Sequence, residues 1–123
     1  MPHSEAYIKM VDEGRKKIKE YTVDEIVQRQ KNGDKFILVD TREDREWDNG
    51  HIKGAIHIGK GVIERDIEGK IPDHDTDIVL YCGGGFRSVL AALPLIEMGY
   101  TKVSSMDGGW REWKQKDLPI EKD

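Results

Sequence analysis

The chain has 123 residues and is therefore expected to form one domain with at most a short extension. Its 20 basic and 24 acidic residues give a net charge of −4, which argues against a protein that binds nucleic acid by neutralising phosphates. No apolar run is long enough to cross a membrane, and residues 1–17 lack the apolar stretch of a signal peptide, so a cytoplasmic location is expected.

The N-terminal segment has the pattern of an amphipathic helix over residues 4–19. Its apolar residues fall roughly on one stripe, which consists of Tyr7, Ile8, Val11 and Ile18. We interpret residues 1–20 as a helical extension that packs on the rest of the chain, with a partner-binding helix as the alternative. Residues 21–123 then form the main domain.

The next helix has clear signals at both ends. Thr22 and Glu25 form a capping box at its start, and an Asn-Gly pair at residues 32–33 is typical of a helix end. A short apolar run at residues 36–39 then predicts a strand that is buried on both faces and is followed by Asp40.

Strands and helices alternate over the remaining chain. Helical turns are predicted at residues 43–49 and 62–67, strands at 55–58, 78–81 and 101–105, and helices at 87–98 and 110–116. Pro94 lies inside one of these helices and is expected to kink or shorten it. The alternation is typical of an α/β fold with a mostly parallel central sheet and helices on both faces.

The segment after the third predicted strand carries the chemistry. Cys82 follows at the carboxyl end of that strand, where open parallel sheets bind ligands. Gly83, Gly84 and Gly85 have no side chains, so their N–H groups can point inward and hold an anion, and the next helix adds the positive end of its dipole. Together with the guanidinium of Arg87, these groups favour the reactive thiolate.

Cys82 is the only cysteine, which excludes an internal disulfide and a cysteine-rich zinc site. The alternative is an inert buried cysteine in a tight turn, but three consecutive glycines cost backbone entropy and Arg87 would then have no partner. Four residues separate Cys82 from Arg87. So short a loop suits one extra sulfur atom on Cys82 better than a phosphoryl group with its several oxygens.

Several segments, in order, resemble the single-domain rhodanese family of sulfurtransferases. They read VDTRE at 39–43, EW at 46–47, GHIKGA at 50–55, CGGGFRS at 82–88, MGY at 98–100 and MDGGWREW at 106–113. The resemblance covers roughly residues 21–121. It implies a rhodanese-like fold with a central, mostly parallel five-stranded sheet.

The resemblance also implies a two-step sulfur transfer that needs no cofactor and no metal. Cys82 attacks the outer sulfur of a donor and becomes a persulfide, which a thiophilic acceptor then discharges. The loop that holds the anion would consist of Gly83, Gly84, Gly85, Phe86, Arg87 and Ser88. Asp40 and Arg42 would orient this loop or bind substrate, with a structural salt bridge beneath the loop as the alternative.

The resemblance implies thiosulfate, a thiosulfonate or a persulfide as the donor, and cyanide or a thiol as the acceptor. Because no second cysteine can resolve the persulfide, the acceptor must be external, either a small molecule or another protein. Residues 83–86 bring no basic side chain, which argues against a strong preference for a doubly charged donor. No nucleic-acid or membrane partner is expected.

Three other functions are compatible with the same loop. The first is a sulfur-delivery or redox-sensing module with little turnover of its own. The second is a phosphatase or arsenate-type enzyme on the same fold, which the loop length disfavours. The third is a catalytically inactive interaction domain, which the presence of Cys82 disfavours.

Overall fold

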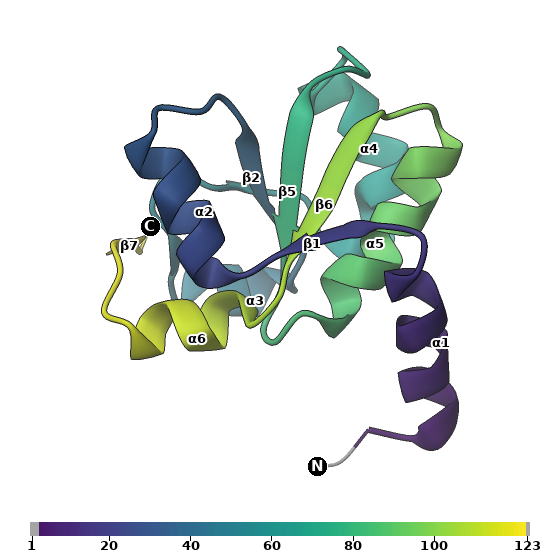
Figure 1. The fold of residues 1–123 in the computed structure, drawn as a ribbon, viewed down its shortest axis with the longest axis horizontal. Helices are drawn as coiled ribbons and strands as arrows, with labels where there is room; N and C mark the ends of the chain where they lie inside the picture. Colours follow the sequence, from purple (N-terminus) through teal and green to yellow (C-terminus); the bar gives the residue numbers. More distant parts are fainter. Residues whose placement is uncertain (1–2, 123) are drawn as a thin grey trace.

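A five-stranded sheet forms the centre of the computed structural model, which describes residues 3–122 (Figure 1). Its strands are β1 (Lys19–Tyr21), β2 (Ile37–Asp40), β4 (Ile56–His57), β5 (Asp77–Tyr81) and β6 (Lys102–Met106). They lie in the order β1-β6-β5-β2-β4, and every neighbouring pair is parallel. A second, two-stranded antiparallel sheet joins β3 (His51–Ile52) to β7 (Ile120–Glu121).

Helices cover both faces of the central sheet. They are α1 (Glu5–Arg15), α2 (Val23–Lys31), α3 (Asp44–Asp48), the 3-10 turn η1 (Lys60–Val62), α4 (Ile63–Lys70), α5 (Phe86–Glu97) and α6 (Gly109–Gln115). Figure 1 shows α2 and α6 on one side of the strands and α4 and α5 on the other. The α/β fold with a parallel five-stranded sheet is therefore confirmed.

Alternation along β5 divides the core into two layers, because successive side chains of a strand point to opposite faces. Val79 and Tyr81 pack with residues of α2 and α6, whereas Ile78 and Leu80 pack with residues of α4 and α5. All four side chains are fully buried. Burial on both faces explains why this strand is an unbroken apolar run in the sequence.

The N-terminal helix is shorter than predicted. The expected helix over residues 4–19 ends at Arg15, and Lys19–Tyr21 instead forms β1, an edge strand that pairs with β6. The boundary expected between residues 20 and 21 falls inside this strand. A strand of three residues has too little pattern to be recognised, and the same holds for β3 and β7, which the sequence analysis also missed.

Helix α1 packs against α5. Val11 and Gly14 are its two buried residues, and a Cβ at Gly14 would lie 3.0 Å from Cγ1 of Val89. Glycine is thus the residue that allows the two helices to approach closely. The contact holds the N-terminal segment beside the start of α5, which immediately follows the Cys82 loop.

Pro94 does not shorten α5. The helix runs to Glu97, although Pro94 cannot donate a hydrogen bond to the previous turn. The turn that follows is intact, because the N–H of Met98 donates to the carbonyl of Pro94 at 2.9 Å. At 12 residues α5 is the longest helix, and no helix in the described part of the chain is long and apolar enough to span a membrane.

A double-glycine turn connects β6 to α6 and brings this helix against the Cys82 loop. The N–H of Trp110 donates to the carbonyl of Cys82 at 2.8 Å, and that of Arg111 donates to the carbonyl of Gly83 at 3.0 Å. Gly109 has a φ of +52°, and a Cβ there would overlap the carbonyl oxygen of Cys82. Only glycine therefore permits this approach.

Gly109→Ala is expected to destabilise the protein by about 2 kcal/mol or more, because a left-handed alanine is strained and its Cβ would push α6 off the loop. Denaturant unfolding measures the change. Gly69→Ala in α4 is the matched control, because nothing lies within 4 Å of its Cβ position and it should stabilise the helix by up to about 1 kcal/mol. Equal stability of the two variants would contradict the close approach of α6.

Candidate active site

Cys82 lies directly after β5, and its sulfur is held inside the loop that follows. The N–H of Gly85 donates to Sγ at 3.1 Å, and Oγ of Ser88 lies 3.5 Å from the same atom. Oγ of Ser88 is also 2.8 Å from Oγ of Ser105, at the end of β6. Two hydrogen-bonding groups within the described chain therefore converge on the sulfur.

Three successive carbonyl groups, at residues 81–83, accept hydrogen bonds from neighbouring elements. The carbonyl of Tyr81 accepts from both N and Oγ1 of Thr41, each at 2.9 Å. The next two carbonyls accept from Trp110 and Arg111 at the start of α6. With these oxygens fixed outward, the backbone presents N–H rather than C=O to the sulfur, as the glycine run suggests.

The sulfur is more enclosed than the sequence analysis expected. Cys82 is only 1% exposed, and a single backbone N–H, that of Gly85, contacts Sγ among residues 3–122. Gly85 adopts a φ of +113°, which a side chain would disfavour. Gly85 directly precedes α5, so this φ sets the direction in which the chain enters the helix.

Arg87 lies in the first turn of α5, and its guanidinium is close to the loop. A Cβ placed on Gly83 would be 3.0 Å from Nη2 of Arg87. Its guanidinium makes two hydrogen bonds to the carboxylate of Glu46 on α3, at 2.7 and 3.1 Å. These hydrogen bonds raise the pKa of Arg87 and lower the pKa of Glu46 below its ordinary value of 4.5. Arg87 is therefore a charge beside the loop that a carboxylate already partly neutralises.

Asp40 and Arg42 pair with each other, and Arg42 also lines a hollow with Gly83 of the loop. Both are buried, and Nε and Nη2 of Arg42 donate to the Asp40 carboxylate at 2.7 to 3.1 Å. Nη2 also donates to the carbonyl of Gly50 at 2.7 Å. The guanidinium lies 4.7 Å from the ring centroid of Trp110, the residue whose N–H holds Cys82. The geometry is that of a buried ion pair beneath the loop.

Tyr81 belongs to the same buried network. Its hydroxyl accepts a hydrogen bond from the N–H of Ile52 at 3.1 Å, and Asp40 is a further hydrogen-bonding neighbour. Burial raises the pKa of Tyr81, and the negative charge of Asp40 raises it further. The phenol is therefore held as a neutral hydrogen-bonding group.

Arg111 is a site residue that the sequence analysis missed. A Cβ on Gly84 would lie 3.0 Å from its Nη1, so the exposed guanidinium lies over the two glycines that follow Cys82. No carboxylate in the described part of the chain forms an ion pair with it. The signal was present in the Gly-Gly-Trp-Arg segment, but only the fold brings residue 111 back to residue 84.

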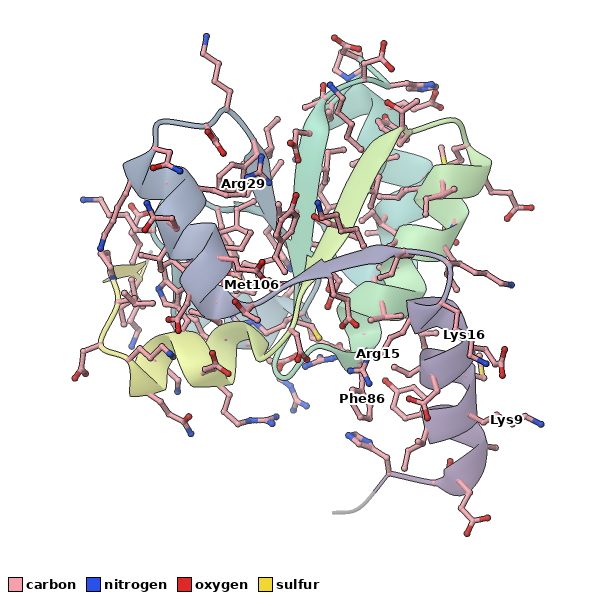
Figure 2. All side chains as sticks on the ribbon, viewed as in Figure 1. Lys9, Arg15, Lys16, Arg29, Phe86 and Met106 are labelled. Carbon is pink, nitrogen blue, oxygen red and sulfur yellow. The ribbon has the colours of Figure 1, made fainter. Side chains whose placement is uncertain are left out.

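Phe86 connects the loop to the N-terminal helix. Its ring lies 5.9 Å from that of Tyr7 and 4.7 Å from that of His3, centroid to centroid. Arg15 lies over the same ring at 5.2 Å, as Figure 2 shows where α1 approaches the loop. The segment predicted to be a packing extension therefore contacts a residue of the candidate site.

The histidines pack against neighbouring groups. His51 stacks on Trp47 with ring centroids 3.4 Å apart, and Nε2 of His57 lies 2.8 Å from the carbonyl oxygen of Arg42. Within residues 3–122, no group of three metal-binding side chains is close enough to hold an ion.

Glu46→Gln is expected to flatten the fall in unfolding free energy on acidification. Because the folded pKa of Glu46 is lowered, its pair with Arg87 contributes stability above pH 4.5 and loses it as the pH falls through the folded value. The contribution should be below about 1 kcal/mol, since the pair is partly exposed.

Urea unfolding of wild type and variant between pH 3 and about 6 measures this difference. In an Arg87→Gln background the Glu46→Gln change should alter the slope less, because the N–H of Glu43 and the charge of Arg42 still lower the pKa of Glu46. A slope difference of the same size with and without Arg87 would show that Arg87 is not the main cause of the lowered pKa.

The sequence is similar to a known protein family and to curated relatives. The family model for the rhodanese-like domain matches residues 22–116. The thiosulfate sulfurtransferase GlpE of Haemophilus influenzae is 36% identical over 85 residues, which are 69% of this chain and 79% of the relative.

Solved structures agree with that match. A Rhodopseudomonas palustris protein of unknown function, described as a possible tyrosine phosphatase, has a TM-score of 0.83 at 30% identity, covering 98% of this chain and 99% of that one. Thiosulfate sulfurtransferase from Pseudomonas aeruginosa shares the fold, with a TM-score of 0.81 at 19% identity over 95% of this chain and 22% of that one. Since the family model spans most of its length, the chain belongs to the rhodanese-like domain family.

Proposed function

We propose that the protein is a sulfurtransferase that carries a sulfane sulfur on Cys82. The observation that carries this proposal is the sulfur of Cys82 inside a glycine loop, with the N–H of Gly85 directed at it and two arginines beside it. Membership of the rhodanese-like family and the similarity to GlpE support the reaction class.

In the first step the Cys82 thiolate attacks the outer sulfur of a donor such as thiosulfate. A sulfur–sulfur bond forms to Cys82, the bond between the two donor sulfurs breaks, and its electron pair leaves with sulfite. The N–H of Gly85 and the hydroxyl of Ser88 stabilise negative charge on the cysteine sulfur before the attack.

In the second step an acceptor removes the outer sulfur and restores the Cys82 thiolate. Cyanide would leave as thiocyanate, and a thiolate would leave as a persulfide anion. Because the chain has one cysteine, no internal thiol competes for the persulfide, and the acceptor comes from outside the chain.

Asp40 and Arg42 act as positioning residues in this proposal. Their buried ion pair supports Trp110, whose N–H in turn holds the carbonyl of Cys82. Neither carboxylate nor guanidinium would touch the donor. Loss of either partner would leave a buried charge without compensation, which typically costs 3–5 kcal/mol.

The charge for an anionic donor comes from Arg111 and Arg87. The argument against a strong preference for a doubly charged donor rested on the absence of basic residues at 83–86. Arg111 changes this inference, because α6 brings its unneutralised guanidinium over Gly84. Thiosulfate is therefore a donor that the site can accept.

Phosphate-ester hydrolysis is the second candidate function, because the Rhodopseudomonas palustris protein is described as a possible tyrosine phosphatase and matches nearly the whole chain. We favour sulfur transfer because the loop has four residues between Cys82 and Arg87, and because Cys82 is buried, with 1% of the residue exposed. A single sulfur atom fits this enclosure better than a phosphoryl group.

Incubation with thiosulfate is expected to add 32 Da to the protein at Cys82, because the thiolate gains one sulfur atom. Intact-mass and peptide mass spectrometry measure the gain. Cys82→Ser should show none, and cyanide should remove the added mass from wild type while forming thiocyanate.

Three results would contradict or redirect this proposal. No mass gain from thiosulfate, a thiosulfonate or a persulfide, with the fold intact, would overturn it. Hydrolysis of a phosphate ester that Cys82→Ser abolishes would favour the phosphatase. A persulfide that cyanide and small thiols discharge slowly, while a protein partner accepts it rapidly, would favour a sulfur-delivery module.

Arg111→Gln is expected to raise the KM for thiosulfate about three- to five-fold, because one exposed positive charge is lost from the loop. Arg111→Lys should restore part of the affinity, and the effect should shrink with added salt. Lys9→Gln removes the same charge from α1, where the side chain points away from the loop (Figure 2), and should leave KM unchanged. Equal KM values for wild type and Arg111→Gln would exclude Arg111 from donor binding.

A further inference from the structure

A hollow of about 300 Å³ lies between the N-terminal segment and the Cys82 loop. It is lined by His3, Tyr7, Gly84, Phe86, Arg87 and Arg111. Its volume is at the lower end of the range for small-molecule sites. Because Gly84 lines it, the hollow opens within two residues of the nucleophile.

One side of the hollow is aromatic. The rings of His3, Tyr7 and Phe86 pack on one another with centroids 4.7 to 5.9 Å apart. Tyr7 and Phe86 are half-buried, so each keeps part of its ring surface available to a ligand. This side favours an apolar group, which aromatic rings hold by stacking and by burial of surface.

The other side is cationic. Arg87 is paired with Glu46, whereas Arg111 forms no ion pair with a carboxylate in the described chain. None of the described residues that line the hollow is acidic. A ligand that is apolar at one end and anionic at the other would therefore match both sides.

The aromatic side is fixed to the loop through Arg15. Its guanidinium lies 5.2 Å from the Phe86 ring centroid, and its Nη2 lies 3.8 Å from Oδ1 of Asp107 (Figure 2). It also donates to Glu20 at 3.3 Å. These contacts join α1, which carries Tyr7, to the loop and to the residue after β6.

We propose that this hollow is a subsite for the organic group of a thiosulfonate donor, an inference that rests on the proposed sulfur transfer. The class of substrate is R–SO₂–S⁻, in which R packs on Tyr7 and Phe86 while the sulfonyl oxygens face Arg111. Thiosulfate has no organic group and gains nothing from the aromatic side.

The chemistry balances without a further reactant. The Cys82 thiolate forms a bond to the terminal sulfur, and the bond between that sulfur and the sulfonyl group breaks. Its electron pair leaves on the sulfinate R–SO₂⁻, so two negative charges enter and two remain. The leaving sulfinate keeps R and its charge, which the two sides of the hollow contact.

Benzenethiosulfonate and methanethiosulfonate test the proposal, because they share the reacting group and the charge and differ only in R. The rate constant kcat/KM for persulfide formation on Cys82 is measured for both and divided by the rate of each donor with a small free thiol. Wild type is expected to favour the phenyl donor about ten-fold after this correction.

Variants of Tyr7 test whether the preference for the phenyl donor arises in the hollow. Tyr7→Ala should lower the ratio about three- to ten-fold, and Tyr7→Phe should keep it because the ring remains. Met10→Ala on the same helix is the matched control, since this side chain is 59% exposed and does not line the hollow. Thermal unfolding of each variant establishes that α1 and the domain are intact.

The outcomes separate the two proposals. Equal corrected rates for the two donors in wild type, or a phenyl preference that folded Tyr7→Ala retains, would overturn the subsite and leave sulfur transfer standing. No persulfide from either donor or from thiosulfate would instead overturn the proposed function.

Discussion

The site depends on two backbone hydrogen bonds, from the N–H groups of Trp110 and Arg111 to the carbonyls of Cys82 and Gly83. They fix the loop with its carbonyl oxygens outward, so the sulfur of Cys82 contacts the N–H of Gly85 and no competing oxygen of those two residues. Gly109 makes the bonds possible, because any side chain there would overlap the loop. The Cys82 loop and α6 therefore form one unit, although the sequence separates them by more than twenty residues.

Two ion pairs stabilise the loop and α6, one of them buried and the other partly exposed. Asp40 and Arg42 are buried beneath it, where their ion pair and the Arg42–Trp110 contact stabilise the start of α6. Glu46 and Arg87 lie nearer the surface, and their partly exposed pair positions the first turn of α5. The deeper pair is costly to break because each charge depends on the other, whereas water screens the outer pair. The deep pair thus maintains the shape of the loop, and the outer pair adjusts the charge beside it.

The N-terminal helix contacts the end of the Cys82 loop through Phe86. This ring follows the glycines of the loop, and its neighbours Tyr7 and Arg15 both come from α1. Because α1 also packs on α5 through Val11 and Gly14, its position is set by the helix that follows the Cys82 loop. A short helix with only two buried residues thereby contributes Tyr7 to a hollow that Gly84 and Arg111 also line.

The sequence by itself determined the α/β fold and the Cys82 loop, because local patterns mark them. These patterns are the apolar runs at 36–39 and 78–81, the capping box that begins at Thr22, and the glycine run after Cys82. It did not determine β1, β3 or β7, since these short segments are not part of an apolar run, whereas three of the four residues at 55–58, around β4, are apolar. Only the tertiary structure decided that Arg42 faces Asp40, that Glu46 partly neutralises Arg87, and that Arg111 and Tyr7 reach the loop. Apart from the pair of Arg42 and Asp40, these contacts join residues far apart in the chain. Side-chain identity alone carries no information about which distant groups the folding of the backbone brings together.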